Sequence, residues 1–287
     1  MACGLLECAN SLDGAKGLCM NMIEPKINEL ALVALTVNLH KGFTALNGRF
    51  VLPELRQVLQ QTHADIVFLQ EVIGAHTAHS VAQPYWPQMP QYEYLADAIW
   101  SDYAYGRNAV YPDGHHGNAL LSKFPIVESH NLDISFSKTE ERGLLYCKLL
   151  EPSSGTYLYT ICIHMGLREK HRQRQLKLLC NLIDTLPDEA PLIVAGDFND
   201  WRLKANRFLA SNAGLVEVFT AGNGRPAATF PARWPLLRLD RIYVRNLRLR
   251  QPSVLTFRPW PHLSDHLPII AELALTPTPA LTVEITP

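Results

Sequence analysis

Residues 191–200 read PLIVAGDFND, and this stretch does most to decide the fold. Its first five residues, apolar and partly β-branched, predict a strand that is buried on both faces, as in the sheets of α/β proteins. Gly196 allows the backbone to turn where the strand ends, without a Cβ clash. Asp197 and Asn199 follow two residues apart, so an extended backbone places them on the same side. The stretch indicates polar chemistry at the end of a buried strand, although Asp and Asn are also typical of a turn that caps the next helix.

The composition is that of an ordinary globular protein, with 47% hydrophobic and 18% charged residues among 287. This length suits one large α/β domain as well as two smaller ones. Residues 1–200 hold 15 Lys and Arg against 22 Asp and Glu, whereas residues 201–287 hold 11 against 5. Arginine predominates in the basic part and suits phosphate. The net charge of −1 nevertheless excludes the strong overall field of a non-specific DNA binder.

Cysteine usage and hydropathy predict where the protein resides. The six cysteines show neither disulfide-framework nor metal-ligand spacing, which predicts reduced thiols. No apolar run is long enough to cross a membrane, and the N-terminus lacks the basic and apolar regions of a signal peptide. We therefore expect a cytoplasmic protein without a transmembrane segment, with peripheral membrane association left open. Nothing in the sequence implies a protein partner.

The folded pattern occupies the middle of the chain. Residues 1–28 predict a flexible N-terminal extension, residues 276–287 a C-terminal tail, and residues 29–275 one domain without repeats or linkers. Apolar runs and alternation predict strands at residues 30–39, 66–70, 156–163, 239–244 and 269–275, and more strands between 91 and 163. Helical spacing predicts helices at 53–61, 168–186 and near 203–211. This mixture indicates one layered α/β domain with two packed sheets.

Polar residues recur at the ends of these predicted strands. They are Asn38, Glu71, His164, Asp240 and the adjacent pair Asp265 and His266. Each has an ordinary alternative role, such as a helix cap, a surface group or an ion pair with a neighbouring arginine. Together they offer the oxygens that Mg²⁺ prefers, and the groups that orient water and donate protons in phosphoryl transfer.

Several blocks of sequence carry a resemblance to a known family. They are, in chain order, Gln70-Glu71, 117–126 (GNALLSKFPI), His164, 196–199 (GDFN), 239–242 (LDRI) and 264–266 (SDH). In this order the chain resembles the endonuclease/exonuclease/phosphatase superfamily, which includes deoxyribonucleases, abasic-site endonucleases, sphingomyelinases and inositol-phosphate phosphatases. Residues 38–43 (NLHKGF) and 105–108 (YGRN) are similar to a bacterial group of uncharacterised metal-dependent hydrolases. The resemblance implies a four-layered α/β/β/α sandwich of two packed mixed sheets flanked by helices, with the site at one mouth.

The resemblance also implies a metal site and a pair that handles water and phosphate. Glu71 would ligate Mg²⁺, for which Mn²⁺ could substitute, with Asn38 beside it and Asp265 on the metal side. Asp197 would orient or deprotonate the attacking water, and Asn199 would hold a phosphate oxygen.

The remaining carried-over roles concern the scissile phosphate. His266 would lie against it, with Asp240 fixing its tautomer and favouring its charged form. His164 would stabilise charge or help to protonate the leaving oxygen. Some nucleases of the family pair this histidine with a glutamate, which no motif places here. Asn118 and Arg142 would support the site or contact phosphate.

Three functions compete on this basis, since a fold family does not fix a substrate. A phosphodiesterase or phosphatase for a small phosphoester or a phospholipid head group agrees with the weak overall charge. A nuclease acting on DNA or RNA agrees with the basic C-terminal third and with Trp201, Trp234 and Trp260, which could stack bases or simply pack. A non-catalytic binding module is the third, although every expected polar residue is present.

Overall fold

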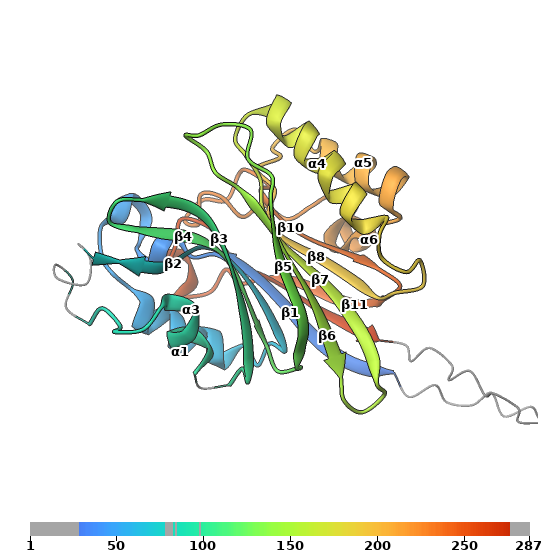
Figure 1. Ribbon diagram of the computed structural model, residues 1–287, viewed down its shortest axis with the longest axis horizontal. Coiled ribbons are helices and arrows are strands. Elements are labelled where there is room, and N and C mark those ends of the chain that lie inside the picture. The colour runs from blue at the N-terminus through green and yellow to red at the C-terminus, as the bar shows by residue number, and fades with distance from the viewer. Residues whose placement is uncertain (1–28, 78–82, 84, 98, 276–287) are drawn as a thin grey trace, which may run out of the picture.

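The structure, a computed structural model, describes residues 29–77, 83, 85–97 and 99–275. The extension predicted at 1–28 and the tail predicted at 276–287 lie outside the described residues. The described strands form two six-stranded sheets (Figure 1). Among the helices of this described part, none is long and apolar enough to cross a bilayer.

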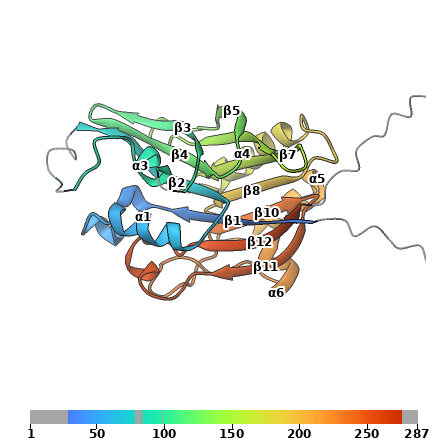
Figure 2. The same cartoon turned by 90° about the horizontal axis from the view of Figure 1, so that it is seen from below.

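The first sheet has the strand order β11-β12-β1-β2-β4-β3. Its strands are β1 (Leu30–Asn38), β2 (Ile66–His76), β3 (Asp102–Tyr111), β4 (Gly114–Ser122), β11 (Arg248–Val254) and β12 (Ile269–Leu275). Strands β1 and β2 pair in parallel and the other neighbours pair antiparallel. Figure 2 shows that β1 begins where β12 ends, in agreement with the pairing of Leu30 with Leu275.

The second sheet has the strand order β5-β6-β7-β8-β10-β9. Its strands are β5 (Ile126–Asp133), β6 (Gly143–Glu151), β7 (Thr156–His164), β8 (Leu192–Asp197), β9 (Val216–Glu217) and β10 (Asp240–Arg245). Here β7 and β8 are the parallel pair, and the other neighbours are antiparallel. Both sheets are therefore mixed, as the sequence predicted.

Three hydrophobic cores lie between the four layers of the fold, which are helices, two sheets and helices. The helices are α1 (Leu52–Gln61), α3 (Gln91–Ala96), α4 (Glu169–Ile183), α5 (Lys204–Ala213) and α6 (Val218–Asn223), with 3-10 turns at His40–Gly42, Ala45–Asn47 and Trp260–His262. One core lies between the sheets and contains Phe68 and Ile242. A second lies between the first sheet and α1, where Leu55 is buried, and a third lies between the second sheet and α4, where Leu179 is buried. Figure 1 shows these helices on opposite sides of the sheets, which confirms the predicted α/β/β/α order.

Strand pairing brings the predicted site residues to one end of the sandwich. Asn38 ends β1 opposite Gln70, the residue before Glu71. His164 ends β7 opposite Asp197 at the end of β8, and Asp240 at the start of β10 pairs with Asp197 from the other side. The parallel pairs thus align their carboxyl ends, so residues distant in sequence share one edge.

A bulge in β2 sets the position of Glu71. Leu69 pairs with Ala119 and Val72 with Gly117, so Gln70 and Glu71 together oppose Asn118. Glu71 adopts a φ of 54°, in the left-handed region that non-glycine residues rarely enter. The sequence predicted that the strand ends at Gln70, whereas β2 continues beyond the bulge to His76. The bulge explains this difference, because it interrupts the apolar pattern without ending the strand.

Gly196 is required where β7 and β8 approach closely. Its φ is 147°, and a Cβ built on it would lie 1.9 Å from the carbonyl oxygen of Ile163. Any side chain at this position would clash with backbone. Gly196 therefore avoids a Cβ clash, as predicted, but it does so inside β8, where that strand approaches β7, and not in a turn after the strand.

Several short elements were absent from the prediction. They are α3, β9, α6 and β11, of which β9 has two residues and α3 and α6 have six. Elements of this length carry too few periods for a pattern to emerge. Strand β11 is an edge strand with mostly exposed or half-buried polar residues, so no apolar run marks it. The longer predicted helices and strands are all present, with shifts of a few residues at their ends.

Candidate active site

Asp197, Asp240 and His266 form a buried cluster at the end of the second sheet. Nδ1 of His266 lies 2.9 Å from Oδ2 of Asp240, and its Nε2 lies 3.9 Å from Oδ2 of Asp197. At most 6% of each residue is exposed. Strand pairing places the two aspartates, and the segment before β12 adds the histidine. Asp240 therefore contacts Nδ1 of His266, while its expected role in fixing the tautomer stays a prediction.

The charges of this cluster favour a protonated histidine beside a carboxylate of raised pKa. Burial alone would lower the pKa of His266, but the carboxylates of Asp240 and Asp197 outweigh it and raise the pKa to about 10. Burial raises the pKa of Asp197 to about 6, Asp240 adds to this rise, and His266 opposes it. The cluster therefore holds a cation at neutral pH next to a carboxylate that titrates near neutrality.

Asn38 links this cluster to Glu71 on the first sheet. Its Nδ2 donates to Oε1 of Glu71 at 3.2 Å and to Oδ2 of Asp197 at 3.3 Å. Its Oδ1 accepts a hydrogen bond from the backbone N–H of His40 at 3.0 Å. The amide thus holds two carboxylates in place with its N–H group. Oδ1 of Asn38, the atom that could ligate a metal, accepts a backbone hydrogen bond here. That Asn38 ligates metal therefore stays a prediction.

Cationic side chains surround the Glu71 carboxylate. Burial would raise the pKa of Glu71, but Lys41, the Asn38 amide, His40 and His116 together bring it below its usual value. Glu71 is therefore ionised over the whole neutral range. Sequence reasoning missed Lys41 and His116 as part of the site. Lys41 lies within the quoted motif NLHKGF and His116 directly precedes GNALLSKFPI, but neither motif shows that these residues lie near Glu71.

The donor set fits a hard divalent cation. Glu71 offers an ionised carboxylate, and Mg²⁺ favours oxygen ligands. One ligand atom from each of Asp197, Asp240 and His266 lies within 4.8 Å of the others. Oδ1 of Asp240 is buried and has no hydrogen-bond partner among the described residues. Because His266 is bonded to Asp240, the carboxylate oxygens are the better candidates for holding a cation.

Asp265 lies at the rim of the site, and a quarter of its side chain is exposed. Its Oδ2 is 4.0 Å from Nε2 of His40, and its Oδ1 is 3.3 Å from the Ser264 hydroxyl. The structure brings Asp265 next to the backbone of His266 and the ring of His40. Its predicted place on the metal side stays a prediction.

His164 is buried and neutral. Its Nε2 lies 3.5 Å from Oδ2 of Asp197. Burial and then the nearby cations Arg142 and His266 hold the pKa of His164 well below its usual value. A neutral imidazole can donate a hydrogen bond to developing charge, but it carries no proton to release at neutral pH. The charge-stabilising option predicted for His164 fits this environment better than the acid option.

Asn199 completes the turn that follows β8. Its backbone N–H donates to Oδ1 of Asp197 at 2.9 Å, and its Nδ2 donates to the Met165 carbonyl at 3.0 Å. Its φ of 49° is in the left-handed region that Asn tolerates best. The turn also supplies a helix cap, because Asp200 accepts a hydrogen bond from the N–H of Ala205 in α5. The capping interpretation therefore applies to Asp200, whereas the catalytic interpretation of Asp197 and Asn199 stays a prediction.

The two predicted substrate-binding residues differ in position. Asn118 is fully buried between the sheets, and its Nδ2 donates to the carbonyls of Gly143 and Cys162. These bonds show a structural link between the sheets. Arg142 is largely buried near His164, with its Nε donating to the Met165 carbonyl at 3.2 Å. Direct contact of either residue with substrate stays a prediction.

The C-terminal arginines do not all lie at the site. Arg248 and Arg250 pair with Glu29 at the other end of the first sheet. Arg241 is fully buried and donates to the Asp240 carbonyl. The basic balance of the last third is thus spread over both ends of the molecule. Among the tryptophans, Trp260 is core and only 2% exposed.

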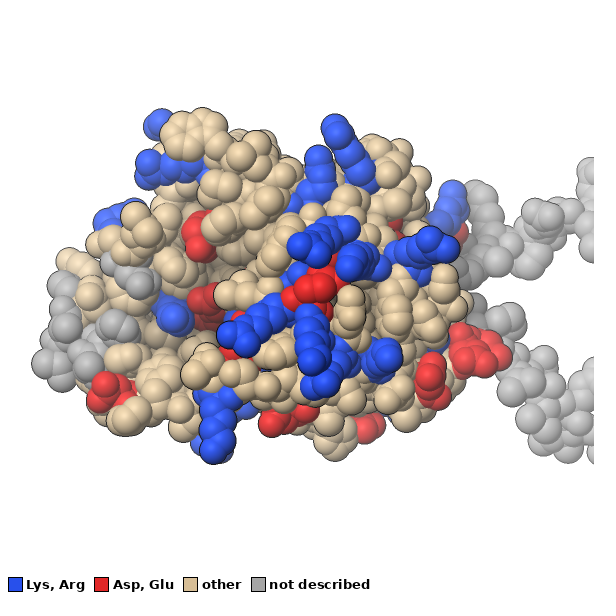
Figure 3. Space-filling model, turned by 90° about the horizontal axis from the view of Figure 1, so that it is seen from above, with Lys and Arg blue, Asp and Glu red and all other residues tan. Residues whose placement is uncertain are grey.

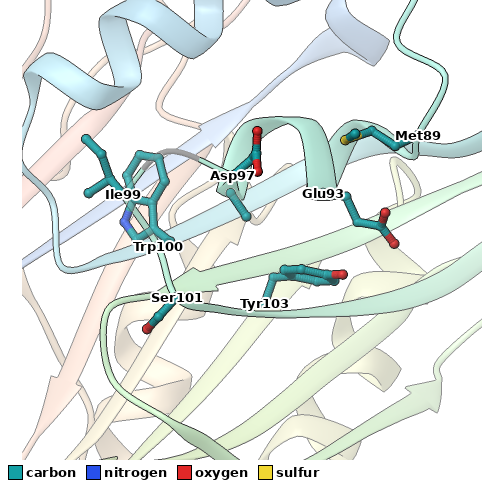
Figure 4. Close-up of a pocket in the computed structure, with 8 residues that line it drawn as sticks. Met89, Glu93, Asp97, Ile99, Trp100, Ser101 and Tyr103 are labelled. Carbon is teal, nitrogen blue, oxygen red and sulfur yellow. The ribbon is translucent and has the colours of Figure 1, made fainter.

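A cavity of about 540 Å³ lies apart from these residues, between α3 and the start of β3 (Figure 4). Its lining includes Met89, Glu93, Trp100 and Tyr103, and none of the site residues. Figure 4 shows the carboxylates of Glu93 on α3 and of Asp97, directly after α3, among its lining residues. It contains no cluster suited to phosphate chemistry, so the candidate site remains at the mouth of the sandwich.

Comparison with known proteins identifies the family and the fold. A sequence profile of the Endonuclease/Exonuclease/phosphatase family matches residues 35–266. The uncharacterised protein YbhP of Escherichia coli K12 is 55% identical over 247 residues, which cover 86% of this chain and 98% of that relative.

Two solved structures share the fold. The mannosyl-6-phosphatase Bt3783 of Bacteroides thetaiotaomicron VPI-5482 aligns with a TM-score of 0.65 and 21% identity, over 84% of this chain and 99% of that one. TDP2 of D. rerio, complexed with a single-strand DNA product, aligns with a TM-score of 0.63 and 20% identity, over 85% and 98% of the two chains. Likeness at these identities concerns the fold alone.

Proposed function

Because the chain belongs to the endonuclease/exonuclease/phosphatase family, we propose that it is a magnesium-dependent phosphoesterase. It hydrolyses a phosphodiester or phosphomonoester by in-line attack of an activated water. The family includes nucleases and phosphatases, and its members are generally dependent on divalent metals. Mn²⁺ is expected to substitute for Mg²⁺, because both accept oxygen ligands.

One observation carries the proposal: a single amide joins the two halves of the site. Nδ2 of Asn38 reaches both Glu71 and Asp197, and Asp197 is close to both His164 and His266. An ionised carboxylate, a carboxylate of raised pKa and a protonated histidine therefore lie in one connected group. Phosphoryl transfer needs these parts: charge neutralisation, an oriented nucleophile and a stabilised transition state.

Glu71 would hold the cation, and carboxylate oxygens of Asp240 or Asp265 would be further ligands. Bound there, a divalent cation supplies positive charge to the phosphate oxygens and to a developing negative charge. Asp197 orients the attacking water and takes its proton, which suits a pKa raised to about 6. Asn199 fixes the Asp197 carboxylate through its backbone N–H, and the second N–H of its side-chain amide, beside the one bonded to the Met165 carbonyl, would donate to a phosphate oxygen.

The histidines stabilise the phosphoryl group. His266 is kept protonated by Asp240 and presents its Nε2 side to the phosphate. His164 donates from a neutral ring, and the guanidinium of Arg142 lies nearby. With these groups in place, most of the rate acceleration would come from positioning and electrostatics.

A small phosphoester or a phospholipid head group is the favoured substrate class. Because Arg248 and Arg250 lie away from the site, the basic C-terminal third is a weaker argument for a nuclease. The nuclease remains the second candidate, because TDP2, which shares the fold, is complexed with a single-strand DNA product. The cytoplasmic location predicted from the cysteines stays a prediction; the three described cysteines are free and buried.

A substrate screen tests the proposal. The purified protein would be assayed with Mg²⁺ and Mn²⁺ against phosphomonoesters, soluble phosphodiesters, phospholipid vesicles, oligonucleotides and plasmid. We expect turnover of at least one phosphoester, with loss on chelation. Cleavage of nucleic acids alone would favour the nuclease. Failure on every activated phosphoester, with the folded protein confirmed, would instead support a binding module.

A further inference from the structure

Large apolar side chains are exposed in the loops around the mouth of the site. Leu46, Leu236 and Trp234 are 96%, 76% and 75% exposed, and Leu167 and Trp201 are 56% and 43% exposed. Soluble proteins seldom gather such residues in one region without a function. Along the chain, each of these loops is within a few residues of a strand that ends at the site or of the pocket that Ser264 and Asp265 line.

The first group, here called the first rim, contains Leu46, Arg233, Trp234 and Leu236. Thr44, Ala45, Arg233 and Trp234 line a pocket of about 280 Å³ together with Ser264 and Asp265, so this rim borders the site directly. Its loop is fixed to the catalytic segment, because the N–H of Ala232 donates to the Asp265 carbonyl at 2.8 Å. The ring of Phe230 also packs on the ring of His266, with centroids 4.9 Å apart.

The second rim contains Leu167, Arg168, Trp201 and Arg202. Leu167 follows His164 by three residues, and Trp201 follows Asn199 by two. The guanidinium of Arg172 on α4 lies 4.3 Å from the centroid of the Trp201 ring, which joins the two loops. This rim therefore borders the site at the ends of β7 and β8 in the second sheet.

Basic residues accompany the apolar ones in both rims. Arg233 precedes Trp234, Arg168 follows Leu167, and Arg202 follows Trp201; all three arginines are exposed. The second rim continues into a basic face over α4 and α5, which Figure 3 shows as a cluster of Lys and Arg side chains around a small acidic group. The exposed members of this face are Lys170, Arg174, Lys177, Lys204 and Arg207.

We propose that the two rims dock the mouth of the site on an anionic phospholipid surface. Leu and Trp side chains would enter the boundary between head groups and acyl chains, and the arginines would contact lipid phosphates. Basic residues beside apolar tips are complementary to this surface, since it is both charged and apolar. Docking itself needs no catalysis, but its use in bringing a lipid head group to the site rests on the proposed phosphoesterase function.

Single-stranded nucleic acid is the competing ligand, and the composition of the rims argues against it. Base stacking needs exposed aromatic faces, whereas Leu46, Leu167 and Leu236 are aliphatic. One face of Trp201 is already covered by Arg172. The aliphatic tips gain nothing from bases, but they gain from insertion into a bilayer.

Vesicle co-sedimentation tests the proposal without any assay of activity. Vesicles of phosphatidylcholine alone would be compared with vesicles of equal parts phosphatidylcholine and phosphatidylglycerol. We expect the protein to sediment with the anionic vesicles and to stay in the supernatant with the neutral ones. The double variant Trp234→Ser, Leu236→Ser should bind about tenfold more weakly or worse. Phe257→Ser is the matched control, because Phe257 is 63% exposed and lines a different pocket, beside α1.

A charge test and a competition complete the experiment. The double variant Arg168→Gln, Arg202→Gln should weaken binding to anionic vesicles by a similar factor, while Arg248→Gln at the far end should not. Hydrolysis of a soluble phosphoester should be unchanged in all these variants, which separates loss of docking from loss of catalysis. Failure to bind anionic vesicles, equal loss in the control variants, or tight binding of a single-stranded oligonucleotide that the rim variants abolish would each overturn the proposal.

Discussion

Two groups of polar side chains meet at the mouth of the sandwich, and the chain holds them differently. Asp197, Asp240 and His266 are almost fully buried and lie on regular strand pairs or are bonded to them. Glu71 lies on a bulge with a left-handed backbone and is only half-buried. The members of the first group, Asp197, Asp240 and His266, contact one another. The second group is the Glu71 carboxylate and its surroundings, where the nearest positive charge comes chiefly from Lys41.

This difference separates two tasks. A buried carboxylate–imidazole pair adjusts protonation, because each partner shifts the pKa of the other. An ionised carboxylate at a bulge instead presents fixed negative charge, which suits a cation. We therefore expect variants of the first group to change the chemical step and its pH dependence. Variants of the second group should change the metal requirement.

His266→Ala should have the largest effect. It removes the cation expected beside the phosphate, and we expect kcat to fall by about a thousandfold or more in the most active assay of the screen. His130→Ala is the matched control, because His130 is an exposed histidine on β5. Thermal unfolding of both variants would show that the fold persists. Near-normal turnover by folded His266→Ala protein would exclude the mechanism proposed for this group.

Asp240→Asn should have the next largest effect, on the order of a hundredfold in kcat. It removes the charge that raises the pKa of His266 to about 10, while burial continues to lower that pKa. On the alkaline side, the wild-type rate should fall as pH rises through about 10, and the variant should lose its rate at lower pH. The measurement is the pH profile of kcat/KM for both proteins. An alkaline limb that does not move would separate Asp240 from the charge of His266.

The same pair contributes to stability with a definite sign. The pKa of His266 is above its ordinary value of 6.5, so the stabilisation is complete below about pH 6.5 and is lost as pH rises through about 10. The free energies of unfolding of the wild type and of Asp240→Asn, measured with denaturant, should therefore differ most near pH 6.5, the low end of this range. The difference in free energy of unfolding between the two proteins should become smaller at higher pH. A difference that grows with pH would contradict the assigned positive charge of His266.

Glu71→Gln should act mainly through the metal. It keeps the shape and the hydrogen bond from Asn38 but removes the negative charge, so the Mg²⁺ concentration for half-maximal activity should rise at least about tenfold. Isothermal titration with Mg²⁺ measures the same loss without turnover. Glu128→Gln, a carboxylate on the exposed face of β5, is the control. Unchanged Mg²⁺ binding in Glu71→Gln would move the metal site to the other carboxylates.

The sequence predicted the two groups unequally, for physical reasons. Asp197 and Asp240 follow or begin apolar strands, and regular pairing then places them together, so strand ends alone locate them. Glu71 was located by its motif, but its bulge and its cations could not be foreseen. Lys41 belongs to a turn with positive φ and His116 to β4, and their proximity to Glu71 depends on how loops and bulges pack. Periodicity carries no information on such packing.

Asn38→Ala should have the smallest effect of the series, about tenfold in kcat/KM, because it removes hydrogen bonds to two charged partners but no charge. Since Nδ2 of Asn38 donates to both Glu71 and Asp197, the variant also tests whether the two groups act together. A double-mutant cycle with Glu71→Gln measures their coupling. If the amide joins them, its loss should matter less once Glu71 has lost its charge. Strictly additive effects would mean that the two groups work independently, each held by its own sheet.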